Sequence, residues 1–225
     1  MRIPIARYGI GTLSVVTLLL GGAAALGLWL FWPLAVVAGA LWLGVVWFFR
    51  DPERRAQCAP EDLLSPADGV VRDIEEVDPP AFIEQRTVRV GIFMSVLNVH
   101  VNRSPADGIV RWISYHPGTF RDARSESVGE NEHNLLGLEL PDGRRLLVNQ
   151  IAGAVARRIV CKPEVGAELK RAQRFGMIKF GSRVELYLPL ADGYEIAVQP
   201  GMRVTAGLTV LASRPTAAPQ SPGTA

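Results

Sequence analysis

Ser182 is the residue whose position most suggests chemistry, because it directly follows a glycine in a run of alternating side chains. In residues 176–189 the apolar positions share one parity with Ser182 and the charged positions share the other, which is typical of a half-buried strand. The inward set is Ile178, Phe180, Ser182, Val184, Leu186 and Leu188, and the outward set is Lys179, Arg183, Glu185 and Tyr187. We therefore expect Ser182 to point inward, next to a Gly181 carbonyl that no Cβ shields. A β-bulge or a close-packing point would use the same two residues without any chemistry.

A serine hydroxyl is a weak nucleophile at its free pKa and needs a base, and a histidine base needs an acceptor that fixes its tautomer. His100 shares strand parity with Asn98 and Asn102, opposite three apolar neighbours, so we expect it on a polar face instead of in the core. A surface histidine on an edge strand would show the same pattern. The other two histidines are weaker candidates, since His116 is predicted in a turn and His133 in a polar loop.

An internal repeat supplies two equivalent carboxylates. The segment Ser65-Pro-Ala-Asp-Gly-Val-Val-Arg72 recurs as Ser104-Pro-Ala-Asp-Gly-Ile-Val-Arg111. Asp68 and Asp107 occupy the same place in it, and most Asp-Gly pairs are simply turns, so the local sequence does not separate their roles. The repeat predicts two pseudo-symmetric halves of one β-structure. A looser echo, of residues 163–169 in residues 200–208, resembles the hairpins of lipoyl-type domains.

The elements that would position these residues are mostly strands. Asp-Gly pairs at 68–69, 107–108, 142–143 and 192–193 precede strand-like runs at 70–71, 109–113, 145–151 and 194–198. The sequence therefore predicts a mainly β (α+β) fold, with one barrel-like or sandwich-like catalytic domain over residues 50–212. Within residues 50–212, only residues 165–175 have helical character. Residues 213–225, rich in Pro, Ala, Ser and Thr, are expected to be a disordered tail.

Residues 8–49 contain no Asp, Glu, Lys, Arg or His, and these 42 residues suit two membrane passes of about 20 residues each. We expect residues 1–49 to form a transmembrane helical hairpin with its turn at Phe31-Trp32-Pro33; one long tilted span or a signal peptide is the alternative. Arg2 and Arg7 precede the hairpin, and Arg50, Arg54 and Arg55 follow it. Positive flanks stay cytoplasmic, so the rest of the chain is expected on the cytoplasmic side of a cell membrane, with the arginines facing anionic lipid.

Charge and cysteine content narrow the range of functions. The net charge of +2 comes from Arg2 and Arg7, because residues 50–225 hold 22 basic and 22 acidic side chains. This balance gives no sign of nucleic-acid binding. Cys58 and Cys161 form no Cys-x-x-Cys motif, and with the histidines far apart in sequence we expect no metal site.

Three segments carry a resemblance to a known family. Phe180-Gly-Ser182, Ser65-Pro-Ala-Asp-Gly69 and Asn98-Val-His-Val-Asn-Arg-Ser-Pro105 resemble, in their order and spacing, the short bacterial form of phosphatidylserine decarboxylase, over roughly residues 48–212. That resemblance implies self-cleavage between Gly181 and Ser182, after the Ser182 hydroxyl adds to the Gly181 carbonyl. Ser182 would become a covalent pyruvoyl cofactor, and the cleaved fragment would remain as a second subunit. The ketone would then form a Schiff base with the amine of phosphatidylserine, and the conjugated carbonyl would accept the electrons left when CO2 departs. The product would be phosphatidylethanolamine in the bacterial inner membrane.

The same resemblance implies that Asp68 orients His100, which acts as base in cleavage and as acid in reprotonation. One departure matters, because larger relatives carry a second histidine where this chain has Arg103, so either His100 performs both roles or His116 takes one. A membrane-tethered serine hydrolase using the same three side chains, or a non-catalytic β-domain scaffold, are the alternatives. A hydrolase of the usual kind would carry a Gly-x-Ser-x-Gly elbow, which this sequence lacks.

Overall fold

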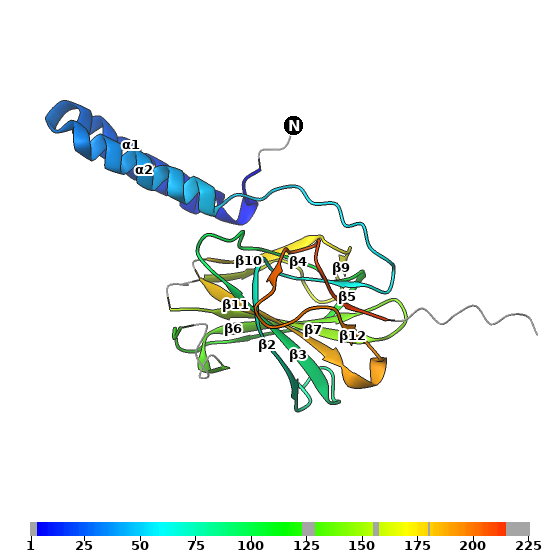
Figure 1. Ribbon diagram of the computed structural model, residues 1–225. Helices are drawn as coiled ribbons and strands as arrows, with labels where there is room; N and C mark the ends of the chain where they lie inside the picture. Colours follow the sequence, from blue (N-terminus) through cyan, green and yellow to red (C-terminus); the bar gives the residue numbers. More distant parts are fainter. Residues whose placement is uncertain (1–3, 123–128, 155–157, 180, 215–225) are drawn as a thin grey trace, which may run out of the picture.

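A computed structural model describes residues 4–122, 129–154, 158–179 and 181–214 (Figure 1). After a short 3-10 turn, η1 (Arg7–Gly9), two helices lie side by side as a hairpin that projects from the β-structure: α1 (Ile10–Leu30) and α2 (Trp32–Phe48). The chain reverses at Phe31, whose backbone is extended, and Pro33 stands in the first turn of α2, where proline is well tolerated. The expected helical hairpin and its turn are confirmed.

The hairpin presents apolar side chains to its surroundings. Leu18 is 77% exposed and Trp29 is 82% exposed, although both side chains are largely apolar. The segment Arg7–Leu30 is long and apolar enough to cross a bilayer, whereas Trp32–Phe48 is shorter. An apolar N-terminal helix of this kind suggests membrane association.

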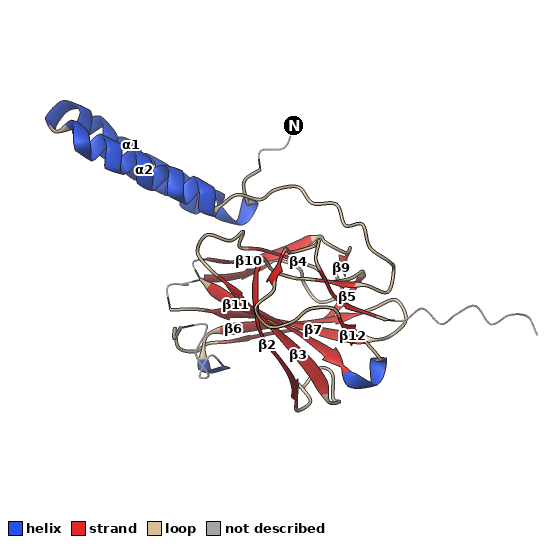
Figure 2. Ribbon diagram, in the orientation of Figure 1, coloured by secondary structure: helices blue, strands red, loops and turns tan. Residues whose placement is uncertain are grey.

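The remainder is mainly β, as expected (Figure 2). An antiparallel eight-stranded sheet curls into a half-barrel in the order β13-β2-β3-β11-β7-β6-β5-β9, and two three-stranded sheets have the orders β4-β10-β8 and β1-β14-β12. The first strands are β1 (Leu63–Leu64), β2 (Gly69–Val77), β3 (Thr87–Met94), β4 (Val101–Arg103), β5 (Gly108–His116), β6 (His133–Glu139) and β7 (Arg145–Ala152). The later strands are β8 (Arg158–Cys161), β9 (Glu168–Leu169), β10 (Arg174–Lys179), β11 (Ser182–Pro189), β12 (Glu195–Ile196), β13 (Arg203–Val204) and β14 (Val210–Ser213), with a 3-10 turn, η3 (Leu190–Asp192), after β11.

One apolar core joins the three sheets. Val184 and Leu186 of β11 are buried in it together with Ile92 of the neighbouring β3. Ile178 of β10 and Leu211 of β14, which belong to the two smaller sheets, are buried in the same core. The smaller sheets therefore pack against the half-barrel, and β11 lies in the middle of the structure, hydrogen-bonded to β3 and β7.

The predicted pseudo-symmetry is present. In each repeat the serine hydroxyl donates to the carbonyl two residues further on. Ser65 donates to Ala67 and Ser104 donates to Ala106, both at 2.7 Å. Two reciprocal backbone bonds join the repeats, from Leu64 N–H to the Pro105 carbonyl at 2.9 Å and from Arg103 N–H to the Pro66 carbonyl at 3.0 Å. The repeats thus face each other, and each leads into a long strand of the half-barrel, β2 or β5.

The looser echo is present as well. Gly166 N–H donates to the Val110 carbonyl of β5 at 2.7 Å, and Gly201 N–H donates to the Val71 carbonyl of β2 at 2.7 Å. Both glycines have φ above +90°, a conformation that side chains with a Cβ rarely adopt. The second echo therefore supplies one equivalent turn beside each half of the repeat.

Two expectations about local structure were wrong. Residues 176–189 are not one strand, because β10 ends at Lys179 in a three-stranded sheet and β11 begins at Ser182 in the half-barrel. Residues 165–175 are not helical; they form β9, a turn and the start of β10, with Gly166 at φ +94°. The expected inward position of Phe180 lies outside the described residues. Ser213, placed in the tail, is the last residue of β14, and residues 215–225 lie outside the described part.

The foot of the hairpin is packed onto the small sheet that contains β4 and β10. A second buried cluster combines Phe48 and Phe49 from the end of the hairpin with Val101 and Met177 from that sheet. Gly9 lies directly against the ring of Phe49, since a Cβ built on Gly9 would fall 2.0 Å from a ring carbon. Hairpin and β-structure therefore share a packed junction at this point.

We expect Gly9→Ala to disrupt this junction, because the new methyl group and the fully buried Phe49 ring cannot occupy the same space. The free energy of unfolding in detergent should fall by about 1–3 kcal/mol, measured by urea titration. Gly21→Ala is the matched control, since a Cβ at Gly21 meets nothing within 4 Å. Equal stability of the two variants would show that the junction does not contribute to the fold.

Candidate active site

The chain passes from one sheet to another at Gly181. Gly181 has φ +66°, a left-handed conformation that glycine adopts without strain, and this backbone turn allows β10 and β11 to belong to different sheets. Ser182 then starts β11 in register with Met94 of β3 and Ala152 of β7. Its side chain is fully buried, as expected, and its hydroxyl lies 3.3 Å from the Met94 sulfur.

The carbonyl of Gly181 has a hydrogen-bond donor. The backbone N–H of Gly153, which directly follows β7, donates to the Gly181 oxygen at 3.2 Å. A donor in this place stabilises negative charge on the oxygen when a nucleophile adds to the carbonyl carbon. Sequence reasoning missed Gly153, and no local signal could have found it, because only the pairing of β7 with β11 brings it to Gly181.

His100 lies against the same residue. Its Nε2 accepts the N–H of Gly181 at 3.3 Å, and its Nδ1 lies 3.0 Å from the carbonyl oxygen of Asn98. This pattern assigns the proton to Nδ1 and leaves a lone pair on Nε2 facing the Gly181–Ser182 segment. The expectation that His100 lies on a polar face was wrong, because its side chain is fully buried and its ring packs 4.4 Å from that of Phe48.

The environment keeps His100 neutral. Burial lowers its pKa from 6.5 to about 4, the Asn98 carbonyl and the charge of Asp68 act in the opposite direction, and the charge of Arg50 adds to the lowering. A neutral imidazole at physiological pH can accept a proton, which is the state a general base requires.

No hydrogen bond or ion pair joins Asp68 to His100 in the described part of the chain. Its carboxylate forms a two-point ion pair with Arg54, with Nη2 2.8 Å from Oδ2, and it accepts the N–H of Ala206 at 2.8 Å. Asp107, in the sister turn, accepts the equivalent backbone N–H from Arg171 at 3.0 Å. The two carboxylates thus accept equivalent backbone hydrogen bonds, but only that of Asp68 is paired with Arg54 in the described residues. In the described residues the ring of His100 is oriented by Asn98 instead, while Asp68 acts on it only through its charge.

The other candidates lie elsewhere. Arg103 is buried and donates to Asp51 at 3.0 Å and to the carbonyls of Pro52 and Ala172, so it supports the segment that follows the hairpin. His116 and His133 are not in a turn and a loop as predicted. They are the facing ends of β5 and β6, and their rings stack at 4.7 Å.

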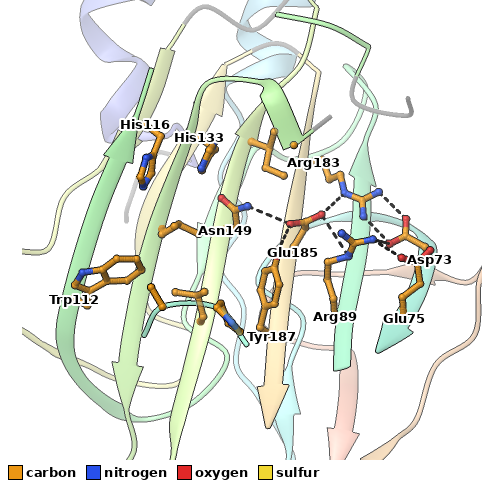
Figure 3. Close-up of a pocket in the computed structure, with 16 residues that line it drawn as sticks. Asp73, Glu75, Arg89, Trp112, His116, His133, Asn149, Arg183, Glu185 and Tyr187 are labelled. Carbon is orange, nitrogen blue, oxygen red and sulfur yellow. Dashed lines mark hydrogen bonds and ion pairs between the residues drawn. The ribbon is translucent and has the colours of Figure 1, made fainter. Parts of the chain in front are cut away.

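These two histidines line a hollow of about 700 Å³ on the opposite face of β11 from Ser182 (Figure 3). Arg183 and Glu185 lie there and are buried, although their parity predicted a solvent-facing position. Arg183 forms a two-point ion pair with Asp73, at 2.6 and 2.7 Å, and donates to Glu185 at 2.8 Å; Glu185 also accepts from the Tyr187 hydroxyl at 2.7 Å. Arg89 lies 3.4 Å from Asp73 and 3.8 Å from Glu185, so two arginines face these two carboxylates and the network anchors β11 on the side opposite Ser182.

Comparison with known proteins gives a consistent result. Residues 43–212 match the family model for phosphatidylserine decarboxylase. The chain is similar to a phosphatidylserine decarboxylase proenzyme of Symbiobacterium thermophilum, with 49% identity over 85% of this chain and 89% of the relative. A relative of the same description from Rhodopirellula baltica is 45% identical over 93% and 88%, and one from Ralstonia nicotianae is 42% identical over 92% and 94%.

The lowered pKa of His100 predicts a pH dependence of stability. The unfolded chain binds a proton at this residue below pH 6.5, whereas the folded chain does so only near pH 4. The contribution of neutral His100 to the free energy of unfolding is therefore fully present above pH 6.5. It is lost as the pH falls toward 4, by up to about 3 kcal/mol. We expect urea unfolding in detergent to show this loss in a Ser182→Ala background, which removes the candidate nucleophile, and not after a further His100→Gln substitution. Parallel curves for the two proteins would contradict the assignment.

Proposed function

The chain belongs to the phosphatidylserine decarboxylase family, and on that premise we propose that it converts phosphatidylserine to phosphatidylethanolamine, using a pyruvoyl group made from its own Ser182. The single observation that carries the proposal is the arrangement at Gly181. Its carbonyl accepts a hydrogen bond from Gly153, its N–H contacts a neutral buried His100, and the next residue is an inward-facing serine.

In the proposed cleavage, Ser182 Oγ adds to the carbonyl carbon of Gly181 and the peptide C–N bond breaks, leaving an ester and a free amine on Ser182. His100 is the base for the hydroxyl proton, and the Gly153 N–H stabilises the charge on the Gly181 oxygen. Loss of the Ser182 α-proton then breaks the Cβ–Oγ bond and releases a chain that ends in the Gly181 carboxylate. Addition of water and loss of ammonia convert the remainder of Ser182 into a pyruvoyl group.

The surroundings of Ser182 suit such a group. The side chain is enclosed between β3 and β7 next to the Met94 sulfur, so a small uncharged acyl group can occupy the same space. When present, the pyruvoyl group supplies a carbonyl that accepts the electrons left by departing CO2. The chain's own part is to hold the substrate amine at position 182 and to return a proton. His100, covered by the ring of Phe48, is the candidate acid.

The position of β11 explains how the cut protein would stay together. Residues 182–225 include β11, which lies between β3 and β7 in the half-barrel, and β14, which pairs with β1. These ladders and the shared core do not depend on the Gly181–Ser182 bond. We therefore propose that the fragment remains bound as a second subunit.

Membrane attachment would place this site near its substrate. We propose that the hairpin of α1 and α2 inserts into the bacterial inner membrane. Because the chain reverses at Phe31, both ends of the hairpin lie on one side, where Arg7, Arg50 and Arg55 favour the cytoplasm. The catalytic part would then face phospholipid headgroups from the cytoplasmic side.

The geometry gives less support to a serine hydrolase. Ser182 begins strand β11, whereas the usual hydrolase nucleophile lies on a sharp turn between a strand and a helix. A buried serine beside a carbonyl of its own chain suits attack on that carbonyl.

We expect the purified protein to consist of two chains, residues 1–181 and a fragment beginning at position 182 with a pyruvoyl group in place of an amine. Intact mass spectrometry after denaturation checks this. Ser182→Ala removes the nucleophile, so it should yield one chain without decarboxylase activity, while Ser114→Ala, outside the site, should be cut normally. An unbroken chain in active wild-type protein would overturn the proposal.

We also expect the two repeat carboxylates to differ. The charge of Asp68 pairs with Arg54 and favours proton uptake by His100. Asp68→Asn removes this charge, so self-cleavage should slow about tenfold or more. Asp107→Asn keeps the turn and should be cut at the wild-type rate. The rates are compared by following the two fragments on denaturing gels during synthesis. A requirement for Asp107 with Asp68 dispensable would assign the role to the other half of the repeat.

A further inference from the structure

Basic side chains gather at the foot of α1, around a hollow of about 730 Å³ that none of the preceding chemistry uses. The cations are Arg7, Arg158, Lys162 and Lys179, from the start of the hairpin and from the ends of β8 and β10. The wall formed by α1 is largely apolar and includes Gly11, Val15 and Val16. The hollow therefore joins a cationic side, on the small sheet, to an apolar side, on the membrane helix.

Among the described residues, the lining of this hollow contains four cations and no carboxylate. Within the described ranges, none of the four cations has a carboxylate within 4 Å. Lys179 donates to the hydroxyl of Thr12 at 2.9 Å and lies 5.9 Å from the centre of the Phe49 ring, so its neighbours carry no formal negative charge. Burial and the charge of Arg158 lower the pKa of Lys179. Four cations without an anion are electrostatically unfavourable unless a ligand supplies the negative charge.

Two of the three arginines expected to face lipid have other partners. Arg54 is buried in its ion pair with Asp68. The guanidinium of Arg50 lies 4.3 Å from the centre of the Trp47 ring and donates to the carbonyls of Trp47 and Leu97. Of the three, only Arg55 is an exposed side chain. The larger group of cations without a carboxylate partner therefore lies at the hollow beside α1, and not at residues 50–55.

We propose that this hollow binds the anionic headgroup of a phospholipid and holds phosphatidylserine beside the cleavage site. The proposal rests on the proposed function, since it assigns the step before the chemistry. The cations would contact the phosphodiester and carboxylate, and the acyl chains would lie along the apolar side of α1, in the bilayer. Lys179 is three residues from Ser182, at most about 11 Å along the chain, so a headgroup held at Lys179 is within reach of position 182.

The test uses the full chain with Arg158→Gln and Lys162→Gln combined, because both side chains are exposed and neither takes part in cleavage. Lys170→Gln with Arg203→Gln is the matched control, since it removes the same charge from exposed residues outside the hollow. Native mass spectrometry in detergent measures how many molecules of dioleoyl phosphatidylserine, phosphatidylglycerol or phosphatidylcholine stay bound. Turnover is measured on vesicles of phosphatidylserine in phosphatidylcholine and on dispersed short-chain phosphatidylserine.

We expect the hollow variant to lose retention of both anionic lipids, while the control and the wild type keep them and none of the three proteins retains phosphatidylcholine. Each cation near anionic lipid contributes a factor of about five in binding, so the phosphatidylserine fraction that gives half-maximal rate should rise about 5- to 25-fold at unchanged kcat. The difference should shrink in high salt. Added phosphatidylglycerol should compete in the wild type.

Two results would overturn the inference. Equal lipid retention by the hollow variant and the control would show that the hollow is not a lipid site. Loss of retention with an unchanged half-saturating fraction would show that the bound lipid is not the substrate. Failure of the proposed function is seen separately, because it removes turnover of the dispersed substrate by the wild type and leaves lipid retention unaffected.

Discussion

The passage of the backbone between two sheets at Gly181 is the constraint on which the rest of the structure depends. Because β10 and β11 belong to different sheets, Gly181 between them is not paired in a regular ladder. Its N–H contacts His100 and its carbonyl contacts Gly153, so the two groups that would assist nucleophilic addition also complete the backbone hydrogen bonding. Fold and reactivity thus use the same two contacts.

Buried charge is distributed so that this junction stays neutral. The ion pairs Asp68–Arg54 and Asp51–Arg103 support the segment after the hairpin, and Arg183 with Asp73 and Glu185 holds β11 from the opposite face. A buried pair of this kind contributes little net stability, but the loss of one partner leaves an uncompensated charge and costs about 3–5 kcal/mol. The pairs therefore restrict where the strands can lie, while burial keeps His100 neutral beside Gly181.

The hairpin is packed onto the β-structure as well as joined to it by the chain. Its exposed apolar surface favours lipid, whereas its foot is buried against the sheet that carries β4 and β10, and Phe48 covers His100 directly. His100 accordingly lies at the boundary between the apolar helices and the β-structure.

Local pattern was enough to predict the mainly β fold, the helical hairpin, the inward-facing Ser182 and the paired Ser-Pro-Ala-Asp-Gly turns, because periodicity and turn chemistry act over a few residues. It failed where distant strands meet. Alternation made residues 176–189 look like one strand and His100 and Arg183 look exposed, since it reports which side chains share a face and not whether a second layer covers that face. Likewise, only the tertiary structure separates Asp68 from Asp107, through Arg54, and only the pairing of β7 with β11 brings Gly153 to Gly181. These contacts join residues far apart in the sequence, so no local signal encodes them.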